Sequence, residues 1–150
     1  MTAEPCGDEA FAAYRPWFYA AAAYNLIWGA VNVIAPSLFF DIIDAGEPNY
    51  LPIWQVVGMF VLVYAPAYWW AARRPARHRH LILIGLLGKI LGPIGFVWAI
   101  ANDDLPQAFG WTIITNDLIW WPAFGSTCGT SSGAAAAPER SFSATEPLVK

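Results

Sequence analysis

Charged residues are scarce in this chain, at 13% of its 150 residues, whereas soluble domains carry about a quarter. The two cysteines, Cys6 and Cys128, stand in polar terminal segments and form no CxxC pair. Neither a disulfide framework nor a metal site is therefore predicted. No basic run supports nucleic-acid binding, and acidic residues precede the first apolar stretch, so no signal peptide is expected.

Apolar residues are abundant, at 57% hydrophobic and 16% aromatic. A membrane-crossing helix needs about 20 mostly apolar residues. The sequence has four such stretches, residues 17–35, 51–72, 81–101 and 107–124. They predict an all-α fold: an integral membrane four-helix bundle with antiparallel up-down topology. The fourth stretch is short and contains an internal Asp, so we expect it to insert only with help from its neighbours.

The predicted transmembrane domain spans residues 13–124, between two polar ends. Residues 1–12 are predicted to be a flexible N-terminus. Residues 125–150 are rich in Ser, Ala, Thr, Gly and Pro and have no hydrophobic period, which predicts a disordered tail.

The distribution of basic residues predicts an orientation. Of the eight Lys and Arg residues, only Lys89 lies inside a predicted span. The others lie near the two ends of the chain and in the loop 73–80, whereas the connections 36–50 and 102–106 contain acidic residues and no basic ones. The positive-inside rule therefore predicts a multi-pass protein of the cell (inner) membrane with both termini in the cytoplasm.

Four polar residues fall near the predicted midplane: Lys89, Asp117, Asn116 and Asn25. At about 1.5 Å per residue, they lie roughly 15–18 Å from the outer ends of their helices. We predict a contact between Lys89 and Asp117, because intramembrane charges usually pair inside the protein. The cluster is interpreted either as a structural link between helices or as a proton or ligand site. Asn32 and Gln55 form a second, outer polar layer.

The third stretch has a distinctive glycine pattern. Its glycines form one stripe and are Gly85, Gly88, Gly92 and Gly95. The stripe permits close helix packing, and a packing face within the chain is favoured over a dimer seam. Pro93 lacks the N–H that would bond the carbonyl of Lys89. That free carbonyl beside the ammonium of Lys89 is the best candidate for a site in the sequence, and it could equally be bonded by Thr112, Thr115 or Asn116 across the interface.

The loop 73–80 contains four arginines and two histidines. It could bind anionic lipid headgroups. A determinant of membrane topology is the favoured interpretation, on the charge-bias rule. His78 and His80 have no acidic or thiol companions in this loop, so metal binding is not expected.

Two segments carry a resemblance to a known family: GLLGKILGPIGFVW at residues 85–98 and GWTIITNDLIWW at residues 110–121. Over residues 14–124 the chain resembles small bacterial four-span proteins and is similar to the DoxX-like membrane proteins in size and topology. The resemblance implies a four-helix membrane fold. Through the link of DoxX proteins to quinone-coupled sulfur oxidation, it also implies quinone as a candidate cofactor.

Three functions follow from these observations. The leading hypothesis is a non-enzymatic accessory protein or subunit of a membrane complex, because no catalytic constellation, cofactor motif or metal site is present in the sequence. Its partners would be the lipid bilayer and a second copy or a larger membrane complex, with no nucleic acid. The alternatives are a proton or small-solute transport element built on the Lys–Asp pair, and a quinone-associated redox subunit.

Overall fold

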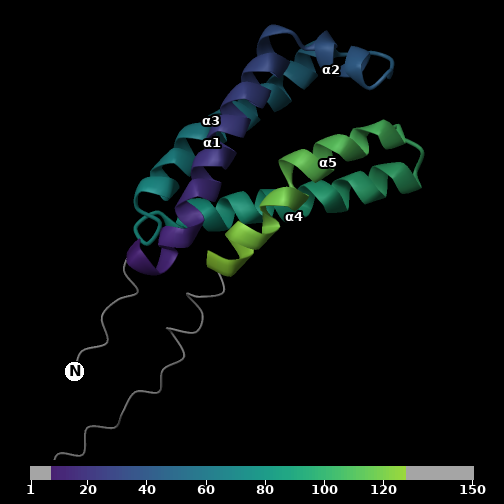
Figure 1. Cartoon of the computed structure of the whole chain (residues 1–150). Helices are drawn as coiled ribbons and strands as arrows, with labels where there is room; N and C mark the ends of the chain where they lie inside the picture. Colours follow the sequence, from purple (N-terminus) through teal and green to yellow (C-terminus); the bar gives the residue numbers. More distant parts are fainter. Residues whose placement is uncertain (1–7, 128–150) are drawn as a thin grey trace, which may run out of the picture.

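The computed structural model describes residues 8–127, which are helical throughout apart from their connections (Figure 1). The elements are η1 (Asp8–Tyr14), α1 (Arg15–Ile34), α2 (Ser37–Ile42), α3 (Leu51–Arg73), α4 (Arg79–Ala101), η2 (Gln107–Phe109), α5 (Gly110–Asn116) and η3 (Leu118–Trp120). Residues 121–127 continue as a helix. No strand occurs between residues 8 and 127, so the all-α prediction is confirmed. The predicted disordered tail falls mostly on residues outside the described range.

Two helices, α3 and α4, are long and apolar enough to cross a membrane, with mean hydropathies of 1.5 and 2.0. The prediction gave four such spans. α1 covers the first predicted stretch, but Asn25 and Asn32 lower its mean hydropathy. The fourth stretch is helical but interrupted at Asp117, so its longest continuous α-helix is the short α5.

The helices alternate in direction but do not form one parallel bundle (Figure 1). α1 and α3 pair along their length and make a first arm. α4 and the segment that follows it, residues 107–127, make a second arm. The arms meet near the α3–α4 loop and spread apart toward their other ends. This differs from the single bundle predicted, and the side chains between the arms give the reason.

Small and aromatic residues pack together where the arms meet. Ala71 and Ala72 are fully buried there, so the helices can approach closely. The ring of Phe124 lies 5.0 Å from that of Phe18 and 5.1 Å from that of Tyr68. These contacts link α1, α3 and the end of the second arm. This inner cluster is the main hydrophobic core of the described residues.

Larger aromatic side chains bridge the arms at the spread end. α2 lies within the connection 36–50, which the sequence showed only as an acidic loop. Its Phe39 stacks on Trp54 of α3 with ring centroids 5.1 Å apart, and it lies 5.2 Å from Phe109 of η2. Phe40 packs on the same rings. We call Phe39, Phe40, Trp54 and Phe109 the outer aromatic cluster; their bulk keeps the arms further apart here than at the inner end.

The N-terminal segment packs on the loop between the arms. Phe11 of η1 is buried, and a carboxylate oxygen of Asp8 accepts a hydrogen bond from the N–H of Ala76 at 3.0 Å. Residues 8–12, which the sequence predicted to be flexible, are therefore helical and attached to the fold. Residues 1–7 lie outside the described range.

Candidate functional site

A cavity of about 210 Å³ lies between the two arms. The four midplane residues predicted from the sequence all line it: Asn25, Lys89, Asn116 and Asp117. α3 contributes an aromatic wall that includes Phe60, Tyr64 and Tyr68. Polar groups from α1, α4 and the second arm's last segment thus converge on one partly open cavity, flanked by the inner cluster and the outer aromatic cluster.

The side chain of Lys89 is buried, with 3% of its surface exposed. Its ammonium donates a hydrogen bond to the backbone carbonyl of Asn116. It also lies 5.6–5.8 Å from the ring centroids of Tyr68, Trp120 and Phe124, within the range of cation–π attraction. No hydrogen bond or ion pair between Lys89 and Asp117 occurs in the described part of the chain. The ammonium therefore contacts the carbonyl next to Asp117 in place of the predicted carboxylate.

A break in the helix explains why Lys89 bonds to a carbonyl. α5 ends at Asn116, and the N–H of Trp120 bonds the carbonyl of Asp117 at 3.1 Å. This tighter turn leaves the preceding carbonyls without their usual donors. Lys89 bonds the carbonyl of Asn116, and the indole N–H of Trp120 bonds that of Thr115 at 2.9 Å. Side chains thus replace the missing backbone donors.

The carbonyl of Lys89, which Pro93 deprives of its backbone donor, is satisfied across the same interface. The indole N–H of Trp121 donates to it at 3.0 Å. The three donors suggested by the sequence bond elsewhere: Thr112 to the carbonyl of Phe109, Thr115 to that of Trp111, and the Asn116 amide to Asp117. Trp121 was not among the expected donors, because it lies near the end of the fourth predicted stretch, 107–124.

The carboxylate of Asp117 is seated against α4. Asp117 is 5% exposed, and its Oδ1 accepts a hydrogen bond from the side-chain amide of Asn116 at 3.0 Å. A Cβ atom added at Gly92 would lie 2.7 Å from Oδ2. Gly92 is therefore the position that admits the carboxylate to the helix surface.

The other glycines of the predicted stripe do not share one role. A Cβ at Gly85 would lie 2.7 Å from the ring of Tyr68, so Gly85 is a packing position within the chain. Gly88 and Gly95 have no heavy atom within 4 Å of an added Cβ. Gly88 lines the cavity. The closest backbone approach lies in the other arm, where a Cβ at Gly29 would be 2.7 Å from the backbone nitrogen of Leu62.

Two amide oxygens near the cavity have no hydrogen-bond partner. They are Oδ1 of Asn25 and Oδ1 of Asn116, and both atoms are buried. Asn25 as a residue is 3% exposed. Together with the Asp117 carboxylate, the cavity therefore offers several hydrogen-bond acceptors. Within residues 8–127, no three His, Cys, Asp or Glu side chains gather where a metal ion could be held.

The outer polar residues have separate structural contacts. The side-chain amide of Gln55 donates to the carbonyl of Val33 at 2.8 Å and so links α3 to α1. The amide of Asn32 donates to the carbonyl of Trp28 at 2.7 Å, within α1. No hydrogen bond joins Asn32 to Gln55 in the described residues, so the two do not form a joint site.

Comparison of the chain with protein-family models, with curated proteins and with solved structures gave no match. The resemblance to DoxX-like proteins therefore stays a prediction from the two quoted segments. The geometry of the cavity and of the surface is the basis for a functional proposal.

Proposed function

We propose that the chain is a multi-pass membrane protein whose four helical segments cross an inner membrane with both termini in the cytoplasm. The two most apolar helices support this, because only 17% of the apolar window of each is buried. Val63 of α3 and Trp98 of α4 are 68% and 72% exposed. Core helices of soluble proteins bury their apolar surface, whereas lipid solvates such faces.

The interrupted fourth segment is consistent with a membrane location. Broken helices occur at membrane depth where they are buried in protein or line a cavity, because their free backbone groups must find partners there. Lys89 and Trp120 bond the freed carbonyls of the break, which lies beside the cavity. In transporters, discontinuous helices of this kind form the binding sites near the bilayer midplane.

The cavity supports a role as a transport element for protons or for a small solute that donates hydrogen bonds. The observation that carries this proposal is the unpartnered Oδ1 of the buried Asn25, beside Asn116 and the carboxylate of Asp117. A buried acceptor without a partner costs about 1–3 kcal/mol. A bound donor would remove that cost, and a carboxylate can pass a proton onward.

A non-enzymatic accessory subunit is the second candidate. The contacts of Lys89 favour it, because its ammonium is engaged by a carbonyl and three aromatic rings, and its own carbonyl by Trp121. Those contacts hold the fourth segment in place whether or not anything moves through the cavity. The two candidates therefore assign different roles to Asp117.

The orientation can be tested with the two native cysteines. An impermeant maleimide added to intact spheroplasts should label neither Cys6 nor Cys128, and should label both after permeabilisation. A matched variant with both cysteines replaced by Ser and Asn102→Cys introduced should be labelled without permeabilisation. Labelling of the native cysteines in intact spheroplasts would contradict the proposed orientation.

Proton flux into proteoliposomes tests the function. A pH-sensitive dye inside the vesicles reports flux driven by a potassium diffusion potential. We expect Asp117→Asn to lower the flux at least about tenfold, as expected for loss of a proton-transfer group, and Asp103→Asn, a matched change in the outer connection, to leave it unaltered. Wild-type flux no greater than that of empty vesicles would favour the accessory subunit.

A further inference from the structure

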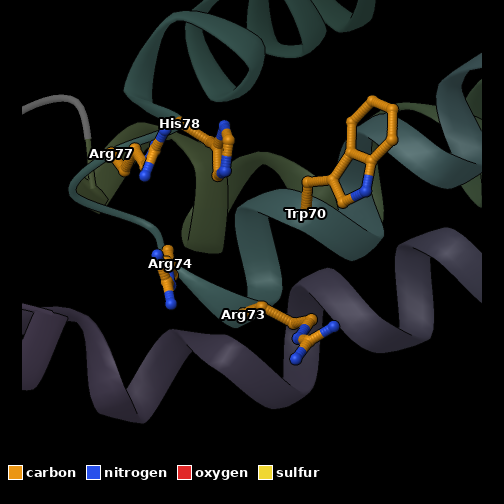
Figure 2. Close-up of a pocket in the computed structure, with 5 residues that line it drawn as sticks. All are labelled: Trp70, Arg73, Arg74, Arg77 and His78. Carbon is orange, nitrogen blue, oxygen red and sulfur yellow. The ribbon is translucent and has the colours of Figure 1, made fainter.

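A second cavity lies at the end of α3 and in the loop that joins the two arms. It has a volume of about 480 Å³ and is lined by Trp70, Arg73, Arg74, Arg77 and His78 (Figure 2). Ligand cavities in proteins typically enclose about 300–1,000 Å³. Three arginines and an indole give this cavity hydrogen-bond donors and no carboxylate. Its chemistry is therefore that of an anion site.

The positive charges of this cavity are uncompensated within the fold. None of Arg73, Arg74 and Arg77 forms an ion pair or donates a side-chain hydrogen bond to another group in residues 8–127. All three side chains are exposed. Asp8, whose carboxylate reaches the same loop, bonds the backbone N–H of Ala76. Guanidinium groups bind phosphate through paired N–H donors, so a phosphate group suits this set of donors.

The backbone of the loop is held in one shape. Asp8 caps it through Ala76, and the side chain of Arg15 donates to the carbonyl of Ala72 at 2.8 Å. Pro75, which belongs to the loop, is fully buried. These three contacts come from η1, from α1 and from the loop itself. The arginines therefore project from a fixed backbone, which lowers the entropy lost when they bind a ligand.

We propose that this cavity binds the phosphate group of an anionic phospholipid in the inner leaflet. The proposal rests on the proposed membrane orientation, which places the loop 73–80 at the cytoplasmic surface. Trp70 is half exposed beside the arginines, and tryptophan favours the headgroup level of a membrane. A topology determinant would need only the sum of the charges, whereas a binding site depends on which arginines line the cavity.

Arg77 and Arg79 provide the matched comparison. Both are exposed arginines of the segment 73–80, Arg77 in the turn and Arg79 at the first position of α4, but only Arg77 lines the cavity. The full chain is purified in detergent, and phosphatidylglycerol binding is measured by native mass spectrometry, with phosphatidylcholine as the reference lipid. We expect Arg77→Gln to weaken phosphatidylglycerol binding about fivefold, the contribution of one basic residue near an anionic surface. Arg79→Gln should stay within about twofold of the wild type, because it lies outside the cavity.

Each alternative has its own outcome. If Arg77→Gln and Arg79→Gln weakened phosphatidylglycerol binding equally, the proposed site would be overturned. The lipid would then respond to the total charge of the segment and not to the arginines that line the cavity. Displacement of phosphatidylglycerol by inorganic phosphate, with the same dependence on Arg77, would overturn the lipid and assign the cavity to a soluble phosphate. The binding measurement does not depend on the direction of insertion. An orientation disproved by cysteine labelling therefore remains distinguishable from a failure of lipid binding.

Discussion

In the first arm, α1 and α3 pack backbone against backbone at Gly29 and Gly58, whereas side chains connect the second arm through hydrogen bonds to backbone carbonyls. A Cβ at Gly29 would lie 2.8 Å from the carbonyl oxygen of Gly58. In the second arm, Lys89 bonds the carbonyl of Asn116 and Trp121 bonds the carbonyl of Lys89. The first arm is joined by close fit along its middle, with side-chain hydrogen bonds from Arg15 and Gln55 nearer its two ends, and the second by exchanged hydrogen bonds.

The difference follows mainly from the break at Asp117, since each arm contains one helix with an internal proline, Pro66 in α3 and Pro93 in α4. α1 has no internal proline, and its contact with α3 uses small residues that let two helices touch. α4 contains Pro93, and the segment opposite it breaks at Asp117. In the second arm, these irregularities free the carbonyls of Lys89 and Asn116, and each of the two takes a donor from the other helix. Polar side chains are therefore needed where the backbone is interrupted.

Gly29→Ala is expected to have the largest effect. The added methyl group would meet backbone atoms of Gly58 and Leu62, which cannot rotate away, so we expect a loss of about 3 kcal/mol in the free energy of unfolding. Gly88→Ala is the matched control, because nothing lies within 4 Å of its added Cβ. Unfolding by SDS titration measures both. Similar losses in the two variants would mean that α1 and α3 are not packed this closely.

Lys89→Met should have the next largest effect. We expect a loss of about 2 kcal/mol in the free energy of unfolding, because the carbonyl of Asn116 is left without a donor. The substitution also leaves the carboxylate of Asp117 without a nearby cation. The amount of folded protein in membranes should fall in Lys89→Met. The double variant Lys89→Met/Asp117→Leu should regain part of that amount, since it removes the uncompensated charge. A double variant that accumulates less than Lys89→Met would show that Asp117 is needed for folding on its own.

Trp121→Phe is expected to cost about 1 kcal/mol, because the carbonyl of Lys89 loses its indole donor. Pro93→Ala restores a backbone N–H that can bond the same carbonyl. Trp121→Phe should therefore cost little when made in the Pro93→Ala background. The control is Trp111→Phe, since that exposed side chain donates no hydrogen bond within residues 8–127. If Trp121→Phe lowered the free energy of unfolding equally in both backgrounds, the stabilising role of the hydrogen bond from Trp121 to the carbonyl of Lys89 would be contradicted.

The sequence allowed the helical content and the polar level to be inferred, but not how the arms pair. Apolar stretches of sufficient length coincide closely with α1, α3 and α4. A long uninterrupted run of hydrophobic residues is what a membrane-crossing helix needs, and such a run is visible in the sequence. Lys89 and Asp117 were placed near each other by depth alone. Depth says nothing of rotation about a helix axis, so it could not show that the ammonium bonds the carbonyl of Asn116.

Packing details required three-dimensional contacts. The stripe on α4 suggested close approach at Gly88, whereas the closest approach of two helix backbones is at Gly29 of α1. A signal for it existed, since the small and polar residues Ala22, Asn25, Gly29 and Asn32 recur at helical spacing and are all buried. The outer aromatic cluster could not be foreseen, because Phe39, Trp54 and Phe109 come from segments that are distant in sequence.

The position of Asp117 near the end of the helical region has a consequence for biosynthesis. Synthesis proceeds from the N-terminus, and membrane segments pair as they emerge. Gly92, Lys89 and the helices of the first arm are all made before Asp117 is. In the membrane topology proposed above, the segment that contains Asp117 thus leaves the ribosome when Lys89, which bonds the carbonyl of Asn116, and Gly92, which admits the carboxylate, already exist. A circular permutation that moved residues 107–127 to the front would remove that advantage while keeping the same residues around Asp117.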